Sequence, residues 1–410
     1  MRSSSRCSNC SRVEGVETVS NEDLVRERIA AVLAANPPAT TSAADFAGAR
    51  FDAGLAWVWF KPGDGGLGVE RDLQRVVETE LAAAGAPEPP PAGLATHMGA
   101  PTIAVHGTEA QRKQWLRRIF TAGERWCQLF SEPVAGSDLG GLATRAVRDG
   151  DEWVVNGQKV WTSGAVGSRW GMLVARTDPD VPKHNGITWF VIDMEQPGID
   201  VRPLRNMMGT AEFNEVFITD ARVPDANRMG EINKGWPVLL ATLMNERLVF
   251  TGDGGPEVAA DLIDLAVGLY KSRGITDPAL RADLMKLYVE AKANGLLNLR
   301  ASLLRADNQP GPDGSLGKFG TTELNKRVTE LMVNVMGADA MVLPGAYPLP
   351  DAAEDEILRD PRFRFLRARA NSIEGGTTQV HKNQVSERVL GLPGEPRVDK
   401  GVPWSQVPRN

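Results

Sequence analysis

Residues 128–164 read QLFSEPVAGSDLGGLATRAVRDGDEWVVNGQKVWTSG, and this stretch decides how the rest of the chain is interpreted. It is rich in Val, Thr and Trp, and VNGQKV contains Asn156-Gly157, a dipeptide typical of tight β-hairpins. The later segments WGMLVART, GITWFVIDM and NEVFITDARVP have the same character, with Gly, Asp, Asn and Pro between them. We therefore predict a module of antiparallel strands beginning near Trp126, with a hairpin at Asn156-Gly157.

Helical periodicity surrounds this module on both sides. Apolar residues recur at helical spacing from Glu22 to about Thr121, and again from Gly235 onward. The stretch 278–306 predicts a long helix that bends or pauses near Gly295, because glycine weakens a helix interior. The predicted fold is mainly α with a central β domain, and ligands often bind in crevices where such modules join. The predicted parts are a flexible extension (1–20), an N-terminal helical domain (21–125), a middle β domain (126–234), a C-terminal helical bundle (235–395) and a tail (396–410).

Composition argues against several classes of partner. The 410 residues carry a net charge of −6 and a pI of about 5.5, so no basic excess is present to bind nucleic acid. No run approaches the ~18 apolar residues of a membrane-spanning helix. The N-terminal MRSSSRCSNCSRVEG is basic but has no apolar core, which is unlike a secretory signal. We therefore expect no membrane span and a cytoplasmic location.

Metal and Rossmann-type dinucleotide sites are not expected either. Cys7 and Cys10 form a single CxxC without a second pair, and the four histidines are scattered without metal-ligand spacing. The stretch 63–68 (GDGGLG) matches GxGxxG in letters only. It lies among predicted helices without a βαβ pattern, so we interpret it as a turn.

The stretch 128–164 closely resembles the flavin-binding signature of the acyl-CoA dehydrogenase family, and three further blocks match in the same order. They are GTAEFNEVFITDARVP at 209–224, GWPVLLATLMNERL at 235–248 and IEGGTTQVHKNQVSERVLGLP at 373–393. Four ordered blocks are far more specific than one short motif. The resemblance covers about residues 21–393 and implies an N-terminal helical domain, a middle antiparallel β domain and a C-terminal four-helix bundle. It also implies FAD, an acyl-CoA thioester substrate, electron-transfer flavoprotein as electron acceptor, and a homotetramer (dimer of dimers) or heterotetramer.

The resemblance also assigns residues to the cofactor and the substrate. Ser137 matches a position that contacts the CoA arm, and Arg273 lies where the family has a pyrophosphate-binding arginine element. The segment around Asn334, Gly337 and Ala338 matches a stretch that reaches a neighbouring subunit's FAD, although the family usually has Gln and a Gly pair there. The remaining implied flavin contacts are Gln128, Leu129, Phe130, Ser131, Trp161, Thr162, Ser163, Thr377, Thr378 and Gln379.

Two glutamates compete for the role of catalytic base. The reaction needs a carboxylate beside the substrate Cα, and hydrogen bonds that stabilise charge on the thioester oxygen. Counting back from Thr377, the base position of the family's YEGT motif falls on Gly375, not on Glu374. Glu246 in LMNERL matches the alternative base position of the isovaleryl and long-chain branches, in which a small residue replaces that glutamate. We therefore expect Glu246 to be the base, with Glu374 as the alternative.

The neighbours of these glutamates have implied roles too. Arg247 is expected to hold the CoA portion or to order the base. The backbone N–H of Gly375 is expected to bind the thioester oxygen together with a ribityl hydroxyl of the flavin, and its missing side chain to leave room for a branched or bulky acyl group.

Two other functions remain open at this stage. The same scaffold serves oxidases that react with O₂, and solvent access at the flavin cannot be read from a sequence. The departures at Ala338 and around Arg273 also allow an FAD-sharing, non-catalytic subunit of a heteromeric dehydrogenase, whereas Glu246 favours a catalytic chain.

Overall fold

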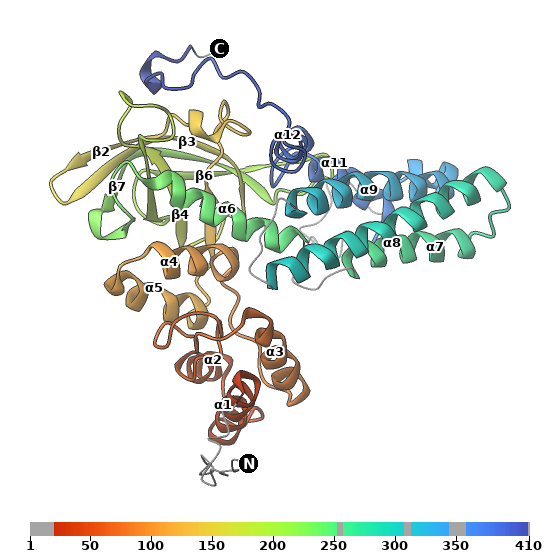
Figure 1. Ribbon diagram of the computed structural model, residues 1–410, viewed down its shortest axis with the longest axis horizontal. Coiled ribbons are helices and arrows are strands. Elements are labelled where there is room, and N and C mark those ends of the chain that lie inside the picture. Colours follow the sequence, from red (N-terminus) through yellow and green to blue (C-terminus); the bar gives the residue numbers. More distant parts are fainter. Residues whose placement is uncertain (1–19, 252–256, 307–312, 344–357, 409–410) are drawn as a thin grey trace, which may run out of the picture. The chain divides into compact units, whose positions relative to one another are not determined.

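The computed structural model describes residues 20–251, 257–306, 313–343 and 358–408 (Figure 1). The side chains of 246–251, 257–261, 302, 305–306 and 313–314 are not among those described. Cys7 and Cys10 also lie outside the described residues. The chain divides into two compact units, residues 1–88 and 89–410, and each is described by itself.

The first unit is a small helical module. Ser20 caps its first helix by accepting a hydrogen bond from the backbone N–H of Asp23 at 3.1 Å. Apolar side chains spaced three and four residues apart, such as Val25 and Ile29, meet those of the other helices in one core. The glycine-rich stretch 63–68 is a turn, as predicted. The elements are α1 (Asn21–Ala35), α2 (Ala43–Asp52), η1 (Arg71–Leu73) and α3 (Gln74–Ala83).

The second unit begins with short helices that lead into the sheet. Residues Ala95–Gly99 form one turn of π-helix, η2, which continues directly into α4 (Ala100–His106). Helix α5 (Glu109–Thr121) begins with a capping box between Thr108 and Gln111. Helix α6 (Gly235–Thr251), which follows the sheet, packs against η2, α4 and β5.

The sheet contains the strands predicted from residue 126 onward. Its order is β6-β7-β3-β2-β4-β5-β8, and β1 joins it by pairing in parallel with β4. Strands β2 and β4 meet in parallel at one residue pair, and the other pairings are antiparallel. Alternate residues of β3, β4, β5 and β7 form one apolar core. The strands are β1 (Trp126–Leu129), β2 (Arg145–Asp149), β3 (Glu152–Ser163), β4 (Trp170–Arg176), β5 (Ile187–Asp193), β6 (Ile199–Leu204), β7 (Phe213–Pro224) and β8 (Arg228–Met229).

The hairpin predicted at Asn156-Gly157 is wrong. Strand β3 runs straight through both residues, and the turn between β2 and β3 is at Gly150, which has φ +66°. The pairing with β7 shifts register between Val155 and Gly157, so the glycine marks a bulge. A Cβ on Gly157 would lie 2.4 Å from Oγ1 of Thr144, so this position requires glycine for a close approach of the neighbouring chain.

The C-terminal helices form the predicted bundle. Helices α7 (Glu257–Ser272), α8 (Pro278–Ala306) and α9 (Asp313–Met336) share one apolar core, and α11 (Pro361–Asn371) and α12 (Thr378–Arg388) pack on α9 (Figure 1). The helix does not pause near Gly295, since α8 is continuous, and the alternative of a bend there stays a prediction. The neighbouring buried Asn294 donates to Oγ1 of Thr321 on α9 at 2.8 Å, and packing of this kind outweighs the weak helix propensity of glycine.

The structure therefore confirms the mainly α fold with a β module in the middle. The domain boundaries given above stay predictions. None of the described helices combines the length and the apolar character that crossing a membrane requires.

Candidate active site

A buried ion pair fixes the segment after β1 that is expected to meet the flavin. Nζ of Lys159 lies 2.8 Å from Oε1 of Glu132 and 3.0 Å from the carbonyl oxygen of Phe130. The side chain of Lys159 is 0% exposed and that of Glu132 is 4% exposed. Burial acts to raise the pKa of Glu132, but Lys159 and the N–H donors of residues 143 and 144 outweigh it and lower the pKa. Burial lowers the pKa of Lys159. The pair anchors residues 130–132 to β3.

Strand β3 ends in an unusual conformation at Trp161. Its φ is +60°, which is rare for a bulky residue, and the register with β7 shifts between Lys159 and Thr162. The Trp161 side chain is 63% exposed, and its ring packs edge-to-face with that of Phe213, at 6.0 Å between ring centroids. The hydroxyl of Thr162 is buried, and no described group hydrogen-bonds to it. An exposed aromatic ring at the end of a strand can pack against a flat aromatic ligand.

The turn between β1 and β2, residues 132–144, is held by charged side chains. The two carboxylate oxygens of Glu132 accept hydrogen bonds from N–H of Ala143 at 2.6 Å and of Thr144 at 2.9 Å. The buried guanidinium of Arg176 donates to the carbonyl oxygens of residues 140 and 142. Ser137 is exposed on this turn, as a residue that contacts a ligand must be.

The loop between α11 and α12 contains two successive glycines in the left-handed backbone conformation. Gly375 and Gly376 have φ values of +61° and +94°, a region that side chains disfavour. Nζ of the buried Lys318 donates to the carbonyl oxygens of Asn371 at 2.8 Å and Gly376 at 2.7 Å. The ring of His381 contacts the Gly375 carbonyl at 3.2 Å. Among the described residues, nothing accepts a hydrogen bond from the Gly375 N–H, so this donor is available to a ligand.

Glu374 forms a bidentate salt bridge with Arg367. Its two oxygens accept hydrogen bonds from Nη1 and Nη2 of Arg367 at 2.9 and 3.0 Å, and Oε1 also accepts one from Asn371 at 2.7 Å. Nε of Arg367 lies 3.9 Å from Glu212, in the loop before β7. A carboxylate held by three donors at once is fixed in its place and is not free to approach a substrate Cα.

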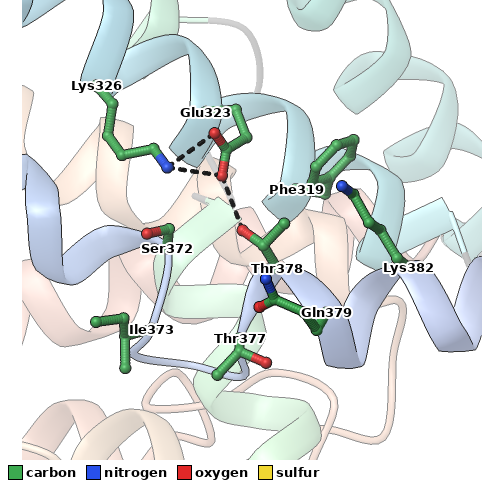
Figure 2. A pocket seen from close by; sticks show the side chains of 9 residues that line it. All are labelled: Phe319, Glu323, Lys326, Ser372, Ile373, Thr377, Thr378, Gln379 and Lys382. Atoms are coloured by element: carbon green, nitrogen blue, oxygen red, sulfur yellow. Dashed lines mark hydrogen bonds and ion pairs between the residues drawn. The ribbon is translucent and has the colours of Figure 1, made fainter.

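A pocket of about 470 Å³ opens between α9 and the start of α12 (Figure 2). Thr377 caps α12, and its N-terminal N–H groups favour an anion. Thr378 donates to Glu323 at 2.8 Å, and Lys326 lies 2.8 Å from the same carboxylate. Burial acts to raise the pKa of Glu323, but the hydrogen bonds from Lys326 and Thr378 outweigh it, so the pKa is lowered. The predicted cofactor residues Thr377, Thr378 and Gln379 all line the pocket.

The segment expected to reach a neighbouring FAD lies on the surface. Asn334, Gly337 and Ala338 are exposed at the end of α9 and in η5 (Gly337–Met341). Nη1 of Arg273 lies 2.5 Å from Asp339 on the same turn. The structure thus brings Arg273, the predicted pyrophosphate ligand, next to the segment that is predicted to reach a neighbouring FAD, at one end of the bundle.

The predicted base can be placed only by its backbone. Position 246 belongs to α6, one turn after Thr242, whose buried hydroxyl lies 2.9 Å from that of Thr102 on α4. The side chains of Glu246 and Arg247 lie outside those described. In the described part of the chain, no cluster of three or more His, Cys, Asp or Glu side chains is placed to hold a metal ion.

These elements define the class of protein. The N-terminal, middle and C-terminal domain models of the acyl-CoA dehydrogenase family match residues 20–123, 127–221 and 233–390. The chain belongs to this family, so it is a flavin-dependent oxidoreductase that dehydrogenates acyl-CoA thioesters. The expectation drawn from the four sequence blocks is confirmed at this level.

Two relatives from Mycobacterium tuberculosis (strain ATCC 25618 / H37Rv) are informative. Acyl-CoA dehydrogenase IpdE1 is 36% identical over 347 residues, which are 84% of this chain and 86% of that protein. Acyl-CoA dehydrogenase FadE34 is 38% identical over 338 residues, 81% of this chain but only 44% of FadE34. The chain therefore spans less than half the length of FadE34.

Solved structures agree on the fold. The "Tcur3481-Tcur3483 steroid ACAD" has a TM-score of 0.70 and 26% identity, covering 91% of this chain and 97% of that chain. The ChsE4-ChsE5 complex from Mycobacterium tuberculosis has a TM-score of 0.66 and 27% identity, covering 94% and 100%.

Sequence reasoning missed the side chains that hold the site together. Lys159, Lys318, Arg367 and Arg176 act on groups between 7 and 58 residues away along the chain. A Lys in the middle of an apolar strand was the available signal, because a buried Lys must be paired.

Proposed function

We propose that the chain uses FAD, held by three groups of residues. Residues 128–131 and 161–163 contact the ring, and residues 377–379 contact the phosphate and adenosine parts. The exposed end of β3 at Trp161 and Ser163 and the pocket at the start of α12 support this assignment. Bound FAD accepts the hydride that leaves the substrate Cβ.

We propose Glu246 as the base that removes the α-proton. The observation that carries this proposal is the engagement of Glu374 by Arg367 and Asn371, which removes the competing carboxylate. Gly375, at the position where many relatives have the base, has no carboxylate to offer. Arg247, next to Glu246, is proposed to hold the CoA portion or to order the base.

The N–H of Gly375 is proposed to bind the thioester oxygen. Lys318 and His381 fix the loop that carries it, so the donor is oriented before substrate arrives. Charge that develops on the oxygen as the α-proton leaves is then met by a preformed donor. The glycine also leaves room for a branched or bulky acyl group.

Anaerobic reduction of the purified protein tests this function. Bleaching of the flavin absorbance is recorded with a panel of short straight, branched and steroid side-chain acyl-CoAs. The steroid member is included because the structurally similar Tcur3481-Tcur3483 protein is described as a steroid ACAD. Bleaching by at least one branched or steroid substrate is expected, and activity confined to short straight chains would contradict the proposal that Gly375 leaves room for a bulky acyl group.

Electron-transfer flavoprotein is the proposed electron acceptor. Mixing the reduced enzyme with O₂ separates this proposal from the oxidase alternative. Slow reoxidation by O₂ and fast reoxidation by electron-transfer flavoprotein are expected, whereas rapid peroxide release would favour an oxidase. The cytoplasmic location stays a prediction.

A tetramer is the proposed assembly. Helix α8 presents an exposed apolar stripe at spacings of three, four and seven residues, the pattern of a helix face that packs against another. The stripe consists of Met285, Val289, Leu296, Leu299 and Leu303.

A heterotetramer is the second candidate, because two structural neighbours are complexes of two different chains and the matched stretch makes up less than half of FadE34. Purifying the chain alone tests it. A yellow homotetramer supports the first assembly, and a colourless chain that gains FAD only with a partner supports the second.

A further inference from the structure

The C-terminal segment returns to the sheet after the bundle ends. The family's C-terminal domain model stops at residue 390, but the chain continues to 408 in the described structure. Its last part lies over the sheet in Figure 1, and the backbone N–H groups of Trp404 and Ser405 donate to the carbonyl oxygens of Val181 and Pro179 at 2.9 and 2.8 Å. The tail is thus tied to the turn between β4 and β5.

Lys183 on that turn joins the tail to the turn expected to bind the substrate. Its Nζ lies 2.8 and 2.9 Å from the two oxygens of Asp138 and 2.5 Å from Oδ2 of Asp399. Burial acts to lower the pKa of Lys183, and the two carboxylates outweigh it and raise the pKa. One ammonium therefore links residue 138, beside Ser137, to the tail.

Trp404 makes the second link. Its Nε1 donates to the carbonyl oxygen of Gly141 at 3.2 Å, and its ring lies 4.6 Å from the guanidinium of Arg176. Arg176 in turn donates to the carbonyls of Gly140 and Leu142, at 2.6 and 3.2 Å. Three successive carbonyls of the turn are therefore held by the tail or by the arginine that the tail covers.

The β4–β5 turn also packs closely against this turn at Gly140. A Cβ on Gly140 would lie 2.8 Å from Nε2 of His184, whose ring packs against Trp236 at the start of α6. The turn is thereby packed against the tail and the β4–β5 turn, although its own sequence contains Gly136, Gly140 and Gly141, which allow the backbone many conformations.

We propose that residues 399–405 are a positioning element for acyl-CoA binding, which holds the turn 132–144 in the shape that receives the CoA arm. This rests on the proposed contact of Ser137 with CoA. Without the tail, substrate has to order the glycine-containing turn when it binds, so affinity falls while the chemistry at Cα and Cβ is unaffected. If substrate binding has to order about one more backbone residue of the turn, the lost conformational entropy raises KM roughly 5- to 30-fold.

Steady-state kinetics of four variants test the proposal in the flavin-loaded enzyme. Trp404→Ala, and a chain ending at Pro393, are expected to raise KM for acyl-CoA roughly 5- to 30-fold with kcat and flavin content unchanged. Lys183→Met is expected to do the same, and Lys183→Arg to restore part of the loss because it keeps the charge. Val398→Ala, on the same tail but 96% exposed, and Lys286→Met, an exposed ion pair on α8, are matched controls.

An unchanged KM in flavin-loaded Trp404→Ala overturns the proposal. So does a fall in melting temperature and flavin content without a change in KM, because that result assigns the tail a purely structural role. The single substitutions keep the test decisive if the shortened chain does not fold. Failure of the proposed function is a different result, since the unaltered yellow enzyme would then not react with any acyl-CoA.

Discussion

Replacing Lys159 with Met should destabilise the flavin-binding segment strongly. The substitution removes an ammonium that is fully buried between Glu132 and the Phe130 carbonyl, and leaves the carboxylate without its counter-ion. Breaking one side of a buried pair costs about 3–5 kcal/mol. Two backbone N–H groups still bind Glu132, so the lower end, about 3 kcal/mol, is expected.

Thermal unfolding monitored by circular dichroism measures this loss. A decrease on the order of 5–10 °C in the melting temperature is expected, together with partial loss of flavin. Adding Glu132→Gln to Lys159→Met should recover part of the decrease, because no buried charge then lacks a partner. Lys113→Met removes the exposed pair with Glu109 and serves as the control, with an unchanged melting temperature.

The pH dependence of the same pair has a definite sign. The pKa of Glu132 is lowered from its ordinary value near 4.5, so its contribution to stability is present above that value and is lost as pH falls through the lowered pKa. In Lys159→Met the lowering charge is gone and burial raises the pKa. As pH falls, the difference in stability between the two proteins should therefore narrow between the raised pKa of the variant and the lowered pKa of the unaltered protein. A gap that is absent at pH 7, or that widens in acid, would refute the reasoning.

Two further substitutions probe the cofactor side and the glycine loop. Ser163→Ala removes an exposed hydroxyl at the end of β3, so the melting temperature of the flavin-free protein should not fall. Flavin reduction should slow roughly 3- to 10-fold, which corresponds to the loss of about one hydrogen bond. Rapid-mixing kinetics test this, and an unchanged rate would mean that the hydroxyl does not meet the cofactor. Lys318→Met removes two hydrogen bonds to the loop that carries Gly375. It should lower kcat more than it raises KM, because the Gly375 N–H that is proposed to bind the thioester oxygen is then less well oriented. A change in KM alone would argue against that role.

Local patterns were sufficient for the order of helices and strands. The period of the apolar residues fixes the type of each element, and the four sequence blocks define the family. The hairpin at Asn156-Gly157 was misplaced because the same dipeptide suits a bulge, and only the close approach of Thr144 decides between them. Similarly, Gly295 does not interrupt α8, since packing against α9 outweighs local propensity.

The supporting contacts of the site were beyond sequence reasoning. The pairs Lys159–Glu132 and Arg367–Glu374 and the return of Trp404 to Gly141 depend on how the strands and loops meet in three dimensions. Residues that bind a ligand can be recognised by their motif, but residues that hold those residues in place follow no fixed spacing.

The central claim is that the base comes from α6 rather than from the glycine loop. Anaerobic flavin bleaching by a reactive acyl-CoA, compared between Glu246→Gln and Glu374→Gln, tests it most directly. Glu246→Gln is expected to bind FAD and substrate but not to bleach, and Glu374→Gln to bleach at a rate close to that of the unaltered enzyme. Normal bleaching in Glu246→Gln with its loss in Glu374→Gln would contradict the account.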